Sequence, residues 1–247
     1  MDQNKFEWTP DFWQSWRESD NPYRQYKSRR DRHLVLKLLE LQDGDNILEV
    51  GCGYGWISEA LWGAAEIQWF GVDRSLEMVR RLQHIPFDAN ARASVADAVR
   101  LPFPDGSFDK VLCTGVLMHI EESDLAVCEL VRVLRPGGRM VCSINNAISP
   151  YSLLVRLWNQ RKRGFVQEFR FPGSFRKLLS GMGVESGEFS GDGIVATVPV
   201  TIGSFEFPPA SICPRLCKLD AWAVNRLPWL AYEVWFSGVK VARACSF

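Results

Sequence analysis

Short apolar runs alternate with amphipathic stretches through the middle of the chain. The apolar runs predict strands at residues 47–51, 67–72, 92–95, 108–113 and 138–144. Between them, apolar positions recur at helical spacing and predict helices at 55–63, 75–83 and 123–134. Strands that alternate with helices form a mostly parallel sheet covered by helices on both faces. The pattern therefore predicts an α/β fold.

The two ends of the chain depart from this alternation. At the start, an aromatic-rich stretch predicts two short helices broken near Pro22, followed by a helix over residues 33–41. Towards the end, residues 184–189 and 232–244 predict two more strands. The proline- and aromatic-rich residues between them predict a lid, because long insertions in compact domains are commonly functional. We therefore divide the chain into an N-terminal helical cap, residues 1–42, and a domain, residues 43–247, with a lid insertion around 190–230.

Alternating glycines follow the first strand at once, at Gly51, Gly53 and Gly55. Such a turn lets the backbone approach a ligand closely, since any β-carbon would block it. The second strand ends at Asp73, where α/β nucleotide-binding folds place an acid that holds a ribose. Trp56 stands where the dinucleotide pattern GxGxxG requires its third glycine. The turn therefore differs from that of a plain dinucleotide-binding fold.

Three further segments complete an ordered set: residues 96–103, 108–113 and 133–141. With the glycine turn and Asp73, they resemble the class I S-adenosylmethionine-dependent methyltransferases, in particular the small-molecule branch of ubiquinone and menaquinone biosynthesis (methyltransferase type 11). The resemblance spans roughly residues 30–145. It implies a Rossmann-like, seven-stranded, mostly parallel sheet that an antiparallel hairpin closes. It also implies S-adenosylmethionine as methyl donor and S-adenosylhomocysteine as product.

The resemblance implies roles for several residues at the donor. Glu49 would organise the turn and the donor's amino group, and the three glycines would pass beneath its amino-acid moiety. Asp73 would accept hydrogen bonds from both ribose hydroxyls. Asp97 would accept from the adenine amino group while Ala98 donates its backbone N–H. Each acid has a structural alternative: a buried ion pair for Glu49, a solvated strand end for Asp73 and a turn for Asp97. The remaining predicted donor contacts are Arg74, Cys113 and Thr114.

The acceptor is expected at the carboxyl end of the fourth strand, because ligands of this fold class bind at the carboxyl ends of strands. His119 is the one imidazole near this end and is the candidate catalytic general base. The alternative is a donor-contacting or structural histidine. Met118 and His119 are predicted to contact the acceptor, together with Tyr23 and Tyr26 of the cap. Packing is the alternative for the two tyrosines.

Composition and a missing motif narrow the acceptor class. The formal net charge is zero, unlike the basic stripe of nucleic-acid-binding proteins. Residues 113–116 read Cys-Thr-Gly-Val where methyltransferases of nucleic acids and protein glutamine carry Asn/Asp-Pro-Pro-Tyr/Phe. We therefore predict a small-molecule acceptor, apolar or aromatic: a metabolite, a natural product or a lipid-linked intermediate. An RNA methyltransferase and a non-catalytic S-adenosylmethionine-binding partner subunit are the alternatives.

Location and metal content follow from simple patterns. The sequence has no apolar run of about 18 residues and no signal-peptide pattern at its start. Its seven cysteines show no disulfide framework. We therefore predict a cytoplasmic protein with reduced thiols. No acidic or histidine cluster indicates a metal, so no metal cofactor is predicted. The oligomeric state is left open.

Residues 215–227 predict a helix between Pro214 and Pro228. At helical spacing one face collects Leu216, Leu219, Ala223 and Leu227, and the other collects Arg215, Lys218, Trp222 and Arg226. Two interpretations stay open. The apolar face packs on the domain and the basic face is solvated, or the basic, Trp-bearing face makes a peripheral membrane contact.

Overall fold

One seven-stranded sheet runs through the structure, a computed structural model that describes residues 11, 20–82, 91–152, 168–194, 200–202, 205–207 and 210–242. The strand order is β3-β2-β1-β4-β5-β9-β6. The strands are β1 (Asn46–Val50), β2 (Gln68–Asp73), β3 (Arg92–Val95), β4 (Phe108–Cys113), β5 (Leu134–Asn145), β6 (Val184–Asp192) and β9 (Glu233–Lys240). Their places in the chain follow the apolar runs of the sequence. The prediction of a seven-stranded α/β sheet is confirmed.

The sheet is parallel except for β9, which pairs antiparallel with both β5 and β6. The four parallel pairs join β3, β2, β1, β4 and β5. The carboxyl ends of these strands therefore meet at one edge of the sheet. The predicted hairpin of the last two strands is β6 with β9, although other elements separate the two strands along the chain.

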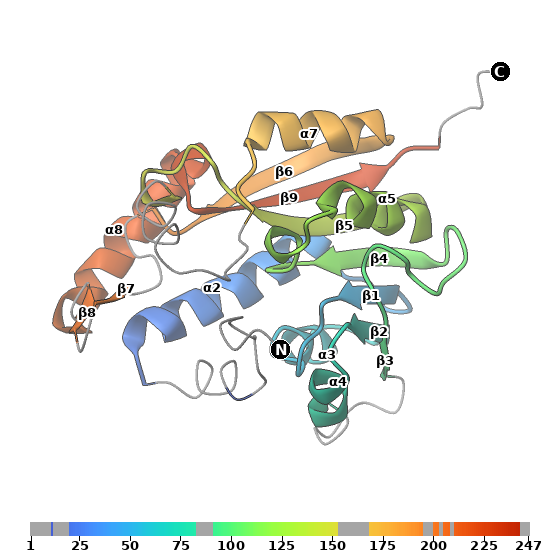
Figure 1. Cartoon of the computed structure of the whole chain (residues 1–247), viewed down its shortest axis with the longest axis horizontal. Coiled ribbons are helices and arrows are strands. Elements are labelled where there is room, and N and C mark those ends of the chain that lie inside the picture. The colour runs from blue at the N-terminus through green and yellow to red at the C-terminus, as the bar shows by residue number, and fades with distance from the viewer. Residues whose placement is uncertain are drawn as a thin grey trace, which may run out of the picture.

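Helices cover both faces of the sheet (Figure 1). On one face lie α5 (Ser123–Val133) and α7 (Pro172–Gly181), whose apolar side chains share a core with the strands. On the other face, α2 (Pro22–Leu39) and α3 (Ser58–Trp62) share a second core that includes Trp69 and Trp235. Beyond β2 the chain continues in α4 (Leu76–Leu82), and beyond β4 in the short helix η1 (Leu117–His119). Both connections start at the carboxyl edge of the sheet.

The helix α2 begins at Pro22, at the position where the sequence predicts a break between helices. Asn21 caps α2, because its side-chain oxygen accepts a hydrogen bond from the backbone N–H of Tyr23 at 2.9 Å. Proline suits the first helical position, where its missing N–H leaves nothing unsatisfied. The helix predicted at 33–41 is the second half of α2. The helix predicted before Pro22 falls mainly on residues outside the described part of the chain.

The segment between β6 and β9 forms a separate layer. It contains a two-stranded hairpin, β7 (Val200–Ile202) with β8 (Phe205–Phe207), then η2 (Ala210–Ile212), α8 (Cys213–Arg226) and η3 (Pro228–Leu230). In Figure 1 this layer lies at one end of the molecule, with α8 near the start of α2. The division into cap, domain and lid stays a prediction. None of the helices in the described ranges combines the length and apolar character needed to cross a bilayer.

Candidate active site

The turn after β1 is built on three glycines with left-handed backbone. The φ angle is 75° at Gly51, 53° at Gly53 and 88° at Gly55, a region that glycine enters without steric cost. A β-carbon on Gly51 would lie 2.1 Å from Cγ2 of Val116. The Gly51 N–H donates to the carbonyl oxygen of Val72 at 2.7 Å. Glycine is therefore required at position 51 by both conformation and space, and the turn is fixed against the end of β2.

The carboxylate of Asp73 is held by the backbone on both of its oxygens. Oδ2 accepts from the N–H of Gly53 at 3.0 Å, and Oδ1 accepts from the N–H of Ser75 at 2.8 Å. Each carboxylate oxygen keeps a second acceptor site. Asp73 is therefore oriented in advance and can accept the two ribose hydroxyls for which the sequence proposed it. Arg74, next to it, is exposed.

The segment of Asp97 lies directly beside that of Asp73. The backbone N–H of Ala96 donates to the carbonyl oxygen of Asp73 at 3.1 Å. Asp97 is exposed, and its Oδ1 accepts from the N–H of Val99 at 3.1 Å. Such a turn is the alternative role that the sequence analysis gave for Asp97. The same hydrogen bond also sets the orientation of the other carboxylate oxygen, Oδ2. Ala98 is buried. The two acids predicted for ribose and adenine thus sit on neighbouring backbone segments.

Glu49 is a buried acid that has no ion pair within the part of the chain that the structure describes. Its Oε2 accepts from the hydroxyl of Ser58 at 2.7 Å and from Nε1 of Trp69 at 2.9 Å. Burial raises the pKa of Glu49 to about 7, partly offset by these two hydrogen bonds, with the nearby Asp73 charge adding to the rise. The ion-pair alternative is not what the structure shows. A cation bound at this carboxylate would find a group that ionises near neutral pH.

The carboxyl end of β4 brings together the remaining predicted donor contacts. Cys113 is fully buried, whereas Thr114 is partly exposed. The next residue, Gly115, donates its backbone N–H to Oγ of Ser143 at 2.9 Å. This bond fixes the chain beyond β4 against the end of β5. Ser143 was not among the predicted site residues, because nothing in the local sequence links it to residue 115.

Met118 and His119 lie in η1, just beyond this point. Met118 is buried, and its carbonyl oxygen accepts from the N–H of Glu168 at 2.8 Å. His119 is partly exposed at the end of η1, and its backbone N–H donates to the carbonyl of Val116 at 2.9 Å. Because Val116 also meets Gly51, this short helix is attached to the glycine turn. His119 therefore stands on the edge of the sheet where the donor residues gather, and its role as base stays a prediction.

Comparison with known proteins gives the family. A family model described as a methyltransferase domain matches residues 48–142, the segment from β1 to β5. The chain is 30% identical over 167 residues to the 2-methyl-6-phytyl-1,4-hydroquinone methyltransferase of Synechocystis, covering 64% of this chain and 52% of that protein. It is 34% identical over 119 residues to a demethylmenaquinone methyltransferase of Symbiobacterium thermophilum, covering 46% of this chain and 47% of that one. The chain thus spans about half the length of these curated relatives.

The matched segment, residues 48–142, is a methyltransferase domain, in agreement with the class I S-adenosylmethionine-dependent methyltransferases that the sequence resembles. A solved structure agrees with the fold. Magnesium protoporphyrin IX methyltransferase of Synechocystis, with bound S-adenosylhomocysteine, superposes with a TM-score of 0.64 at 17% identity, over 93% of each chain. The donor expected from the sequence, S-adenosylmethionine, is the donor of this family. The glycine turn and the oriented Asp73 carboxylate are the features of this structure that fit it.

The two tyrosines predicted at the acceptor connect α2 to α8. Tyr23 is buried and packs with Cys213 at the start of α8. Tyr26 donates its hydroxyl to Oδ2 of Asp220 at 3.1 Å, and Asp220 is fully buried in α8. Burial raises the pKa of Tyr23 to about 12 and that of Tyr26 further. The packing alternative is thus present in the structure for both, and acceptor contact stays a prediction.

A buried ion cluster that sequence reasoning missed joins α2 to β6 and β9. Lys27 Nζ lies 3.0 Å from Asp31, 3.0 Å from Asp192 and 2.8 Å from Glu233. The three carboxylates lie close enough to hold a metal ion, and here the lysine ammonium takes that place. Only the Lys27–Asp31 spacing of four residues is visible in the sequence. The other partners lie 165 and 206 residues away, so tertiary structure alone reveals the cluster.

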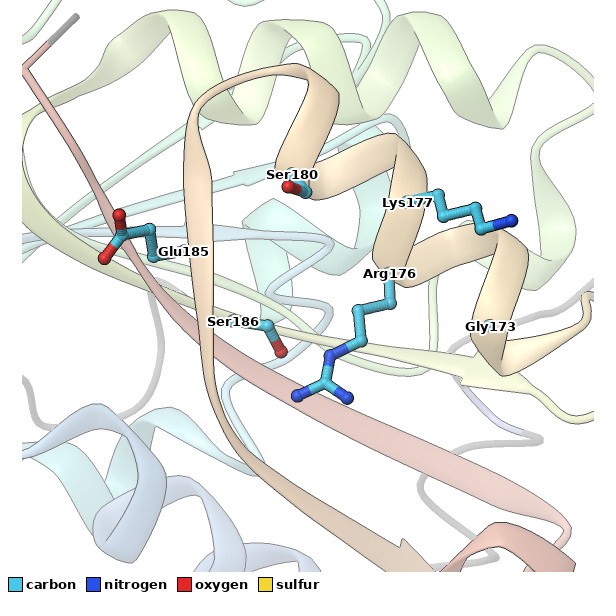
Figure 2. Close-up of a pocket in the computed structure, with 6 residues that line it drawn as sticks. All are labelled: Gly173, Arg176, Lys177, Ser180, Glu185 and Ser186. Atoms are coloured by element: carbon cyan, nitrogen blue, oxygen red, sulfur yellow. The ribbon is translucent and has the colours of Figure 1, made fainter.

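A surface hollow of about 600 Å³ lies on α7 and β6, and its lining residues are drawn in Figure 2. Its lining is polar, and Arg176 extends from the helix towards the strand. None of the predicted site residues lines it; the lining residues are Gly173, Arg176, Lys177, Ser180, Glu185 and Ser186. The hollow lies at the outer edge strand β6, whereas the donor residues belong to β1, β2, β3 and β4. It is therefore a separate feature from the candidate active site.

Proposed function

We propose that this methyltransferase transfers the methyl group of S-adenosylmethionine to a small, largely apolar aromatic acceptor of the hydroquinone class. The main support for S-adenosylmethionine as the methyl donor is the hydrogen-bonded unit of Gly53, Asp73 and Ser75. A carboxylate fixed by two backbone N–H groups beside a glycine turn is suited to a ribose-bearing ligand. The adjacent segment of Asp97 extends the same surface towards the adenine.

The residues of the candidate site would act mainly by positioning the donor and the acceptor for the transfer. Bringing the donor carbon and the acceptor atom together in line accounts for much of the rate enhancement in such reactions. The acceptor atom forms a bond to the methyl carbon while the carbon–sulfur bond breaks, and the electron pair stays on sulfur. The proton that the acceptor loses goes to His119 in this proposal. Glu49, ionised, would face the positive charge of the donor's amino group.

An aromatic cluster supports the acceptor half. Tyr151 and Tyr232 contact edge to face with ring centroids 5.1 Å apart, and Phe169 lies 6.3 Å from Tyr232. All three rings are partly exposed. Hydrogen bonds from Asn146 to the carbonyl of Tyr232, and from Arg170 to the carbonyl of Asn145, place these segments at the carboxyl end of β5. Partly exposed aromatic walls suit a flat ring, for which they supply stacking and buried area.

The names of the relatives point to the same class. The proteins reported above are named for a phytyl hydroquinone and for demethylmenaquinone. Both names describe an aromatic or quinonoid ring with an apolar tail. We therefore favour a reduced quinone over polar metabolites, which would leave the apolar surface of these rings in contact with charged groups.

A direct transfer assay tests the proposal. The purified protein is incubated with isotopically labelled S-adenosylmethionine and either 2-methyl-6-phytyl-1,4-hydroquinone, reduced demethylmenaquinone, phosphoethanolamine or an RNA transcript. We expect a labelled methylated product, identified by mass spectrometry, with at least one hydroquinone. The Asp73→Ala variant should lose the product. Labelling of RNA or phosphoethanolamine alone would overturn the acceptor class. Donor binding without transfer to any acceptor would favour a non-catalytic binding subunit.

A further inference from the structure

The outward face of α8 and η3 carries large apolar side chains. Leu219 is 48% exposed, Trp222 is 55% exposed and Trp229 is 49% exposed. The prediction that Leu219 and Leu227 would pack inward was wrong, because both are exposed. With Arg215, Lys218 and Arg226 these residues form a set that we call the α8 face: Arg215, Lys218, Leu219, Trp222, Arg226, Leu227 and Trp229.

The inward side of α8 explains why the large residues point out. It presents the small or polar residues Cys213, Asp220, Ala223 and Val224, all buried. Asp220 is fixed from two sides, since Oδ1 accepts from the N–H of Ile194 at 2.7 Å and Oδ2 from the hydroxyl of Tyr26. The helix is thus anchored by hydrogen bonds and close packing, not by its largest apolar side chains. Contiguous exposed apolar residues with a polar rim mark an interaction surface.

The charges on this face have one sign. Arg215, Lys218 and Arg226 are exposed, and the single acid of α8, Asp220, is buried on the opposite side. The Arg226 guanidinium lies 5.3 Å from the ring centroid of Trp222. Lysine and arginine beside tryptophan and leucine are the composition of helices that lie in the headgroup region of anionic bilayers.

The face is rigidly connected to the carboxyl end of the sheet. Asn146, the first residue after β5, donates its side-chain amide to the carbonyl oxygens of Trp229 and Ala231, both at 2.8 Å. Tyr26 and Asp220 connect α8 to α2. In Figure 1, α8 lies at the end of the molecule formed by α2 and the start of β9, away from β1, β2 and β3. The face therefore borders the acceptor side and leaves the donor side free.

We propose that the α8 face binds the surface of an anionic lipid bilayer, from which the protein takes its acceptor. The second half of this statement rests on the proposed function, since a hydroquinone with a long apolar tail resides in the bilayer. Trp222, Trp229 and Leu219 insert among the headgroups while the three cations contact lipid phosphates and carboxylates. In this arrangement the described helices lie on the membrane surface and do not cross it.

Vesicle co-sedimentation tests the binding. The protein is mixed with vesicles of phosphatidylcholine alone or with about 30% phosphatidylserine, at low ionic strength and again at about 0.5 M salt. We expect pelleting with the anionic vesicles, and a bound fraction that falls at high salt. Absence of pelleting with anionic vesicles at low ionic strength would overturn the proposal. Equal pelleting with neutral vesicles would overturn its electrostatic part.

Matched variants distinguish vesicle binding by the α8 face from nonspecific adsorption through other exposed side chains. Trp222→Ser with Trp229→Ser should lower the affinity for anionic vesicles at least about tenfold. The control pair is Leu125→Ser with Phe171→Ser, because these side chains are 51% and 59% exposed on other elements. Lys218→Glu with Arg226→Glu should have a similar effect, with Arg176→Glu and Lys177→Glu on α7 as control. An equal loss in the control pairs would contradict the proposal. Circular dichroism melting confirms that each variant is folded.

Activity distinguishes this proposal from the proposed function. The tryptophan variant should methylate a short-tailed, water-soluble hydroquinone as the parent protein does, but lose at least about tenfold in rate with a vesicle-embedded one. Equal loss on both acceptors would contradict a surface role. A self-association that these two variants abolish, seen by light scattering without vesicles, would instead identify a second copy as the occupant. Failure to methylate either hydroquinone, with vesicle binding intact, would overturn only the proposed function.

Discussion

Gly53 donates its backbone N–H to the carboxylate of Asp73 over 3.0 Å, across 20 residues of chain. The acid at the end of β2 and the glycine turn after β1 are therefore one unit. Removal of the carboxylate changes both the ligand contact and the support of the turn. The family match to residues 48–142 spans both parts of this unit.

We predict that Asp73→Ala weakens S-adenosylmethionine binding by about 1.5–3 kcal/mol, because charge-assisted hydrogen bonds are lost. Isothermal calorimetry gives the affinity, and thermal melting shows whether the variant is folded. Glu77→Ala on α4 serves as control, since that acid is exposed and forms an ion pair with Arg81 on the same helix. An unchanged affinity in a folded Asp73→Ala protein would refute the ribose assignment.

Glu49 should make donor binding depend on pH. Its pKa, raised to about 7 by burial, means that the free protein holds a proton there below neutrality. A donor whose ammonium group needs the ionised carboxylate must displace this proton, so affinity should rise with pH. We expect a gain of up to about tenfold between about pH 6 and about pH 8. In Glu49→Gln the affinity should be weaker and flat over this range. A slope that persists in Glu49→Gln would assign the titration to another group.

Gly51→Ala should destabilise the protein by about 2 kcal/mol or more, because the new β-carbon meets Val116 and the backbone there is left-handed. Adding Val116→Ala should restore only part of the loss, since the backbone strain remains. Gly63→Ala is the control, because its β-carbon would meet nothing nearer than 3.9 Å. Chemical denaturation measures the free energy of unfolding of all three variants. Full recovery in the double variant would show that the clash alone requires glycine at position 51.

His119→Ala should lower turnover by about 10²-fold with donor affinity nearly unchanged, if the imidazole takes the acceptor's proton. Steady-state kinetics with the acceptor found in the transfer assay, and calorimetry with the donor, give the two quantities. His33→Ala on the exposed side of α2 is the control. A fall in donor affinity alone would make His119 a donor contact. Normal values for both would make it structural.

The buried ion cluster predicts opposite responses from two of its members. Lys27→Met should cost about 3–5 kcal/mol of unfolding free energy, because it leaves the buried carboxylates of Asp31 and Glu233 without the cation that they share, while Asp192 keeps its ion pair with Arg30. Asp31→Asn should cost much less, within about 1 kcal/mol. Burial and the nearby carboxylates of Asp192 and Glu233 raise the pKa of Asp31 well above its usual range, so its charged form is disfavoured there and loss of the charge costs less. Urea denaturation at neutral pH compares the two. A larger cost for Asp31→Asn would contradict this view of the cluster.

The sequence by itself determined the order of strands and helices, the glycine turn after the first strand and the acids at the ends of the second and third strands. These are local signals, since apolar periodicity and glycine spacing act over a few residues. The same signals carried the resemblance to the methyltransferases, which the family match then supported. The helix boundary predicted near Pro22 is the start of α2, because proline both interrupts helices and begins them. The capping hydrogen bond of Asn21, which only the tertiary structure shows, establishes that Pro22 begins this helix.

The tertiary structure determined the contacts between residues far apart in the chain, which local signals cannot predict. Several contacts join residues that are separated by tens to hundreds of positions, so no local pattern links them. They are the hydrogen bond of Gly115 to Ser143, the packing of Val116 on Gly51 and the ion pairs of Lys27. The orientation of α8 is the clearest case. Its sequence has an apolar stripe and a basic stripe, and periodicity alone assigned Leu219 to the core. The buried hydrogen bonds of Asp220 turn the helix so that Leu219 joins the tryptophan and the cations outside, because an unsatisfied buried carboxylate would cost more than an exposed leucine.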